Sequence, residues 1–137
     1  MSVTLALTAQ DKSTLRSAAY GAVSLIAAAD AAGKPHKAAT RGSLTLAAAT
    51  GPIGHVLAAK TNDLDLSGRS AAALADHVLP ALTQAVRLLD TQDPTLAADY
   101  RATVLTAVEA AAGTHHNRPG PVVADMIRKI TGALDAA

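Results

Sequence analysis

The sequence contains no cysteine, no tryptophan and no phenylalanine, and its only aromatic side chains are those of two tyrosines. Without cysteine the chain cannot form a disulfide, a thiolate metal site or a cysteine nucleophile. Half of its 137 residues are hydrophobic, so the core must be built almost entirely from Ala, Leu, Val and Ile. Such small side chains allow helices to pack at the close end of the interaxial range of about 8–10 Å.

The chain also lacks an excess of either charge. Twelve Lys and Arg residues stand against eleven Asp and Glu residues, giving a formal net charge of +1. Proteins that neutralise nucleic-acid phosphates need a strong basic bias, so we expect no nucleic-acid partner.

Long apolar runs are absent as well. The N-terminal residues lack a basic segment followed by a long apolar run, which argues against a secretory signal. The most apolar stretch, residues 18–29, is too short to cross about 30 Å of hydrocarbon. We therefore expect a soluble, cytoplasmic protein with no membrane association.

The widest apolar stripe lies between Arg69 and Asp90. Leu74, Val78 and Leu82 recur there at the spacing of three and four residues that puts side chains on one face of a helix. Leu89 continues this stripe, and Leu79 and Leu88 widen it, which indicates neighbours on more than one side. We predict that this helix, 69–90, is the centre of the fold.

Start and stop signals divide the chain into about five helices. Thr8 and Asp11 form a capping-box pattern at the start of the first helix. Asp93 followed by Pro94 starts the helix that ends near residue 112. The other boundaries fall at Gly33–Pro35, at Gly51–Pro52, which must bend or break the second helix, and at Gly113.

The apolar spacing also predicts which residues face the core. Gly21, a glycine inside the first helix, is expected to mark a close contact with another helix. The expected inward residues are Leu15, Ala18, Ala22 and Ile26 in the first helix, Ala38, Leu44, Ala47 and Ala48 in the second, Tyr100, Val104 and Val108 in the fourth, and Val123, Met126, Ile130 and Leu134 in the last. Since a chain of this length can bury a core of its own, we predict a single helical-bundle domain over residues 1–137. Its fold is all-α and mainly antiparallel.

Two short segments alternate polar and apolar side chains. These are residues 3–7 and residues 64–66 with their flanks. A period of two is typical of a β-strand. We therefore expect a minor two-stranded ribbon that pairs 3–7 with 64–66.

Five histidines are the main candidates for chemistry, because imidazole titrates near neutrality and is the commonest metal ligand. His115 and His116 are adjacent in a Gly-, Asn- and Pro-containing loop, where a carboxylate such as Asp63 or Asp65 would complete a metal site. The alternative is a solvated polar loop, since adjacent side chains seldom point at one ion and the chain has no H-x-x-x-H or E-x-x-H spacing.

His77 and Tyr20 are candidates for a ligand pocket. Pro80 cannot donate a hydrogen bond to the carbonyl of Asp76, so the helix is expected to bend there and to free that carbonyl beside His77. The alternative is a partly buried histidine satisfied by one hydrogen bond. Tyr20 is equally consistent with the edge of the core or with a binding surface.

His36 lies in a basic turn with Lys34, Lys37 and Arg41. The free N–H groups of a helix N-terminus in that turn can bind a phosphate or a carboxylate. The alternative is a solvated junction in which Asp30 cancels much of the positive field.

No motif specifies a reaction, because G-x-S-x-G, P-loop and G-x-G-x-x-G patterns are all absent. We expect a non-enzymatic association module without a cofactor, acting as a homodimer or on a protein partner. The homodimer is expected because the central and second helices carry more apolar surface than small neighbours need to cover. The alternative is a small-molecule or metal-binding domain, with catalysis included, using a pocket near Pro80 or the histidine-bearing loops.

Overall fold

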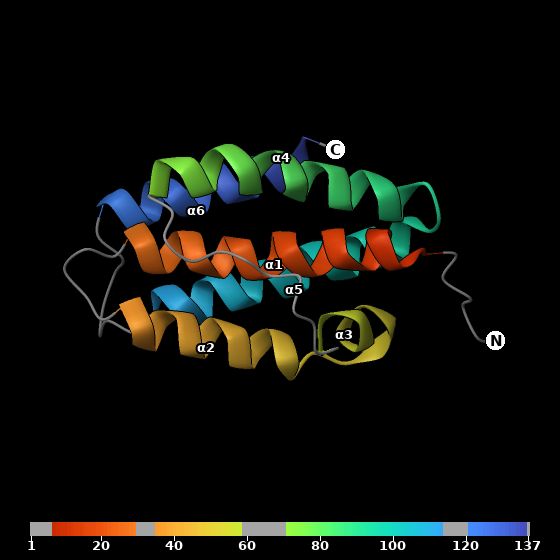
Figure 1. Ribbon diagram of the computed structural model, residues 1–137, viewed down its shortest axis with the longest axis horizontal. Helices are drawn as coiled ribbons and strands as arrows, with labels where there is room; N and C mark the ends of the chain where they lie inside the picture. Colours follow the sequence, from red (N-terminus) through yellow and green to blue (C-terminus); the bar gives the residue numbers. More distant parts are fainter. Residues whose placement is uncertain (1–6, 30–34, 59–70, 114–120, 137) are drawn as a thin grey trace.

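The computed structural model is an all-α bundle and describes residues 7–29, 35–58, 71–113 and 121–136. Figure 1 shows the helices lying side by side, with their order along the chain given by the colours. The described residues form α1 (Ala9–Ala29), α2 (Pro35–Ala47), α3 (Gly51–Ala58), α4 (Ala71–Asp90), α5 (Pro94–Ala112) and α6 (Pro121–Asp135). None of these six helices combines the length and apolarity needed to cross a membrane.

The central position is shared by α1 and α5 rather than held by the predicted helix 69–90. Among the described residues α1 and α5 each pack against all five other helices, whereas α4 packs against α1, α5 and α6 (Figure 1). Ala18, Ala19 and Ala22 of α1 are almost completely buried, and such small side chains allow neighbours to approach from several directions. On α4, by contrast, Asp76 and Gln84 face solvent.

The predicted ribbon is not seen. Residues 3–6 and 64–66 lie outside the described residues, and Leu7 precedes α1 without strand structure. The predicted break at Gly51–Pro52 is confirmed and accounts for a sixth helix where about five were expected. Gly51 has a φ of 79°, a left-handed conformation that glycine adopts at little cost, and it is the first residue of α3, with residues 48–50 between α2 and α3.

The predicted helix ends are confirmed at three positions. Thr8 and Asp11 form the reciprocal capping box, with each backbone N–H donating to the other's side chain at 3.0–3.1 Å. The Asp93 carboxylate accepts a hydrogen bond from the N–H of Thr95 at 2.9 Å at the start of α5. The N–H of Gly113 donates to the carbonyl of Glu109 at 2.9 Å at its end.

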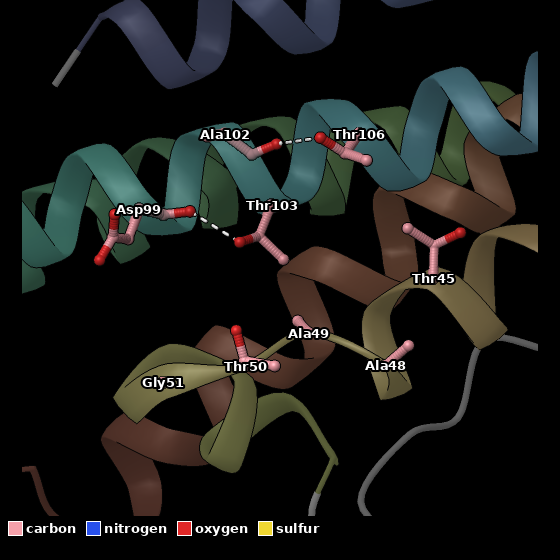
Figure 2. A pocket seen from close by; sticks show the side chains of 9 residues that line it. All are labelled: Thr45, Ala48, Ala49, Thr50, Gly51, Asp99, Ala102, Thr103 and Thr106. Atoms are coloured by element: carbon pink, nitrogen blue, oxygen red, sulfur yellow. Dashed lines mark hydrogen bonds between the residues drawn. The ribbon is translucent and has the colours of Figure 1, made fainter.

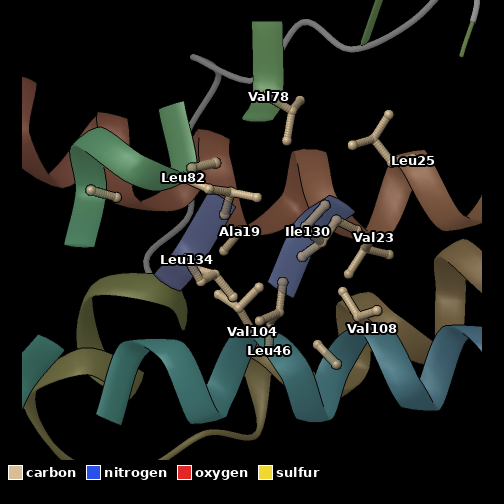
Figure 3. Packing of buried hydrophobic residues seen from close by; sticks show 14 of the residues in the cluster. Ala19, Val23, Leu25, Leu46, Val78, Leu82, Val104, Val108, Ile130 and Leu134 are labelled. Carbon is tan, nitrogen blue, oxygen red and sulfur yellow. The ribbon is translucent and has the colours of Figure 1, made fainter. Parts of the chain in front are cut away.

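The core is aliphatic, as the composition predicts, and draws on every helix (Figure 3). Gly21 marks the close contact expected from the sequence. A Cβ atom at Gly21 would lie 2.6 Å from Cγ2 of Val78, so α1 and α4 approach each other there without room for a side chain. Gly42 does the same between α2 and α1, since its Cβ would lie 2.5 Å from Cγ1 of Val23.

The predicted inward face of α2 is wrong. Leu46 is fully buried, whereas Leu44 is 64% exposed and Ala47 and Ala48 are exposed as well. Gly42 sets this rotation, because it faces Val23 of α1 and Leu46 follows it by four residues on the same side of the helix. Leu44 is two residues from each, so it is turned out of the core and lies at the edge of the contact between α1 and α2. The side chain of Ala38 lies outside the described ones.

Candidate functional site

The structure does not join His77 and Tyr20 in one cavity. His77 and Pro80 lie on the exposed side of α4, which continues through Pro80 as an α-helix. Tyr20 lies on α1, and its hydroxyl donates to the main-chain carbonyl of Leu57 in α3 at 3.0 Å. The cavity beside Tyr20 is lined by residues of α1 and α2, and His77 is not among them.

The other predicted site residues are only partly described. His36 lies in the first turn of α2, but its side chain is outside the described ones. His115 and His116, like Asp63 and Asp65, lie outside the described residues, so the loop metal site stays a prediction. Within the described ranges, no three His, Asp or Glu side chains are grouped so that they could hold a metal ion.

An apolar groove runs beside Tyr20, between α1 and α2. We call it the α1–α2 groove; its cavity of about 450 Å³ is lined by Tyr20, Ala39, Thr40, Ser43, Leu44 and Ala47. Leu44, at 64% exposure, is one of two large hydrophobic side chains in the described residues that are this exposed. None of the six lining residues carries a formal charge. The groove therefore offers contact surface to another apolar side chain.

Tyr20 is held in a fixed position in this groove. Burial raises its pKa above the ordinary value for tyrosine, while the positive charge of Arg16 acts in the opposite direction. The phenol is consequently neutral near pH 7, and its proton is used in the hydrogen bond to Leu57. Tyr20 supplies a positioned aromatic surface to the groove, and no proton at neutral pH.

A second, larger cavity opens where α2 ends. We call it the α2–α5 cleft; it has a volume of about 700 Å³ and is lined by Thr45, Ala48, Ala49, Thr50, Gly51, Asp99, Ala102, Thr103 and Thr106 (Figure 2). The four α5 residues follow one another at spacings of three, one and three, so they form one face of that helix. Gly51, with its positive φ, turns the chain into α3 at the far side of the cleft.

Three of the four threonine hydroxyl groups that line the cleft already donate within their own helices. Thr103 donates to the carbonyl of Asp99 and Thr106 to that of Ala102, both at 2.8 Å, as Figure 2 shows. Thr45 donates to the carbonyl of Arg41 at 3.0 Å. A hydroxyl has one proton and two lone pairs, so these three oxygens can only accept from a ligand. Asp99 is the one charged side chain among the lining residues.

Sequence reasoning named neither cavity. In the sequence, the cleft corresponds to the polar residues Asp99, Thr103 and Thr106, which recur on one side of the helix that begins at Pro94. The solvent-facing side of an ordinary helix has the same pattern, so the sequence does not indicate a cavity there. Leu44 was assigned to the core, so its exposure beside Tyr20 was missed.

Comparison with known proteins gives no relative of this chain. No family model matches it, no curated protein matches it, and no solved structure matches it.

Proposed function

We propose that this chain is a self-association module that forms a homodimer through the α1–α2 groove. The observation that carries the proposal is the exposed side chain of Leu44 at the edge of an apolar cavity lined by Tyr20. Exposed apolar surface beside a groove is typical of protein–protein interfaces. Aromatic residues are enriched at the centres of such interfaces and charged residues are depleted, as they are in this groove.

A second copy of the chain is the occupant that this surface fits best. A protruding leucine and a cavity lie next to each other on the same face, so a two-fold axis would place Leu44 of each protomer in the groove of the other. The low net charge of +1 causes little repulsion between two copies. The hydrogen bond that fixes Tyr20 also reduces the conformational entropy lost on association.

We infer a binding role for the groove because of the chemistry of its lining. The six residues include no His, Asp, Glu, Lys or Arg, and the tyrosine proton is held by Leu57. Such a lining supplies contact area and no general acid or base at neutral pH. We place this association in the cytoplasm, for which the absence of cysteine in the whole sequence is support.

The proposal is tested by the oligomeric state of the chain in solution. Sedimentation across the micromolar range is expected to show a dimer, and Leu44→Glu is expected to give a monomer because it buries an unpaired charge in the interface. Val122→Glu is the matched control, since Val122 on α6 is also 64% exposed but lies outside the groove. A monomeric wild-type chain, or equal dissociation by both substitutions, would overturn the proposal.

A further inference from the structure

We propose that the α2–α5 cleft binds a small organic cation, namely an ammonium group carried on a short aliphatic body. This site shares no residue with the α1–α2 groove. The inference therefore does not depend on the homodimer.

The polar groups of the cleft select for a donor-rich cation. Asp99 brings a carboxylate, and Thr45, Thr103 and Thr106 bring oxygens whose protons are used within their own helices. A primary ammonium has three N–H donors and no acceptor, so it suits a carboxylate and oxygens that can only accept. Asp99 and Thr106 are two helical turns apart on α5, so one ammonium would pair with Asp99 and not with every oxygen of the set. Hydrogen bonds between an ammonium and a carboxylate are also stronger than neutral ones.

The remaining surface of the cleft suits a short hydrocarbon chain. Ala48, Ala49 and Ala102 have only methyl side chains, so they line the space without filling it. Figure 2 shows Thr103 of α5 and Thr50, which immediately precedes α3, facing the same space. A volume of about 700 Å³ lies within the range of about 300–1,000 Å³ typical of small-molecule sites.

An anion is disfavoured at the same place, although α3 begins there. Helix N-termini attract anions through free N–H groups and the helix dipole. Here Pro52 follows Gly51 and has no N–H to donate. The full negative charge of Asp99 opposes the partial positive charge at the start of this short helix.

The test is a titration of the full chain with 1,4-diaminobutane at neutral pH and low salt, followed by amide NMR. We expect saturable shifts at Thr45, Thr103 and Thr106, and an affinity at least about tenfold lower in Asp99→Asn, because the carboxylate carries the only charge in the lining. Asp76→Asn is the matched control: Asp76 is also an exposed helical aspartate, but on α4 and outside the cleft. Its affinity should equal that of the wild type.

Two further probes separate the proposed chemistry from unspecific effects. The neutral analogue 1,4-butanediol and the anion succinate are expected to cause no saturable shifts. Shifts that do not saturate, equal binding by the diol, or an unchanged affinity in Asp99→Asn would each overturn the proposal. Leu44→Ser removes the apolar side chain from the groove without adding a charge beside Thr45, so it should bind the amine as the wild type does, and failure of the dimer and failure of this site are distinguishable.

Discussion

Tyr20 and Tyr100 make the same contact in two different parts of the molecule. Each lies within a helix and donates its hydroxyl to a main-chain carbonyl of another helix, Tyr20 to Leu57 at 3.0 Å and Tyr100 to Leu15 at 2.8 Å. Tyr100 has no exposed surface, whereas Tyr20 is half-buried and lines the α1–α2 groove. The partner helix, and not the local sequence, therefore decides whether a tyrosine is buried in the interior or lines a surface groove.

The difference follows from the length of the partner helices. Tyr100 links α5 to α1, two helices of 19 and 21 residues that lie against each other. Tyr20 links α1 to α3, which has only eight residues. A short partner covers less of the ring, so the same hydrogen bond leaves Tyr20 accessible to a binding partner.

The largest expected difference between the two regions is in stability. Tyr100→Ala should lower the free energy of unfolding by about 3–5 kcal/mol, because it leaves a cavity at a fully buried site. Tyr20→Ala should lower it by no more than about 2 kcal/mol, since solvent already reaches part of the ring. Urea unfolding followed by circular dichroism measures both. Equal losses would contradict the division into interior and surface tyrosines.

The second expected difference appears at alkaline pH. Burial raises the pKa of Tyr100 far above its ordinary value of about 10. Above pH 10 the unfolded chain loses the phenol proton while the folded chain keeps it, so stability falls by at most about 1.4 kcal/mol per pH unit. Below pH 10 the phenol keeps its proton in both the folded and the unfolded chain, so it does not make stability depend on pH.

Tyr100→Phe is the control for this alkaline loss, because lysines titrate in the same range. The difference in unfolding free energy between the wild type and Tyr100→Phe should shrink as the pH rises from 9 to 11. Tyr20→Phe should change the pH dependence less, since Tyr20 is only half-buried and Arg16 opposes the rise in its pKa. A constant difference for Tyr100→Phe would show that this phenol ionises in the folded chain.

Features set by neighbouring residues could be predicted from the sequence. The capping box at Thr8, the start at Asp93 and the break at Gly51 each depend on residues a few positions apart. The close contact at Gly21 was predictable for a different reason, because a glycine inside a helix is unfavourable unless a packing contact accounts for it. The central place of α1 and α5 was not, because buried alanines add little hydrophobic area to the pattern of either helix and yet allow five helices to pack against each.

The candidate site was less predictable, because it depends on how each helix is rotated. In α2 the apolar residues Leu44 and Leu46 lie on different faces, and the sequence alone does not show which face is buried. The contact of Gly42 with Val23 turns the face that carries Leu46 toward the core. Histidines were chosen for their chemistry, but residue type alone does not place a side chain in a cavity. His77 faces solvent on α4, while Asp99 lines the larger cavity among residues with small side chains.

The smallest expected difference is in the stability that each of the two tyrosine hydroxyl groups contributes. Tyr100→Phe removes a buried hydrogen bond to Leu15 and should cost about 1–2 kcal/mol. Tyr20→Phe should cost about 0.5–1 kcal/mol, because the site of its bond to Leu57 is only partly buried.

The double substitution decides whether the two regions are independent. Both hydrogen bonds involve α1, through the carbonyl of Leu15 and the side chain of Tyr20, but they join it to different helices, α5 and α3. Distant sites without shared partners add to within about 0.5 kcal/mol. We therefore expect the loss in the double variant to equal the sum of the single losses in urea unfolding. A larger deviation would mean that α1 transmits strain from the core to the groove, so the interior would help to set the shape of the binding surface.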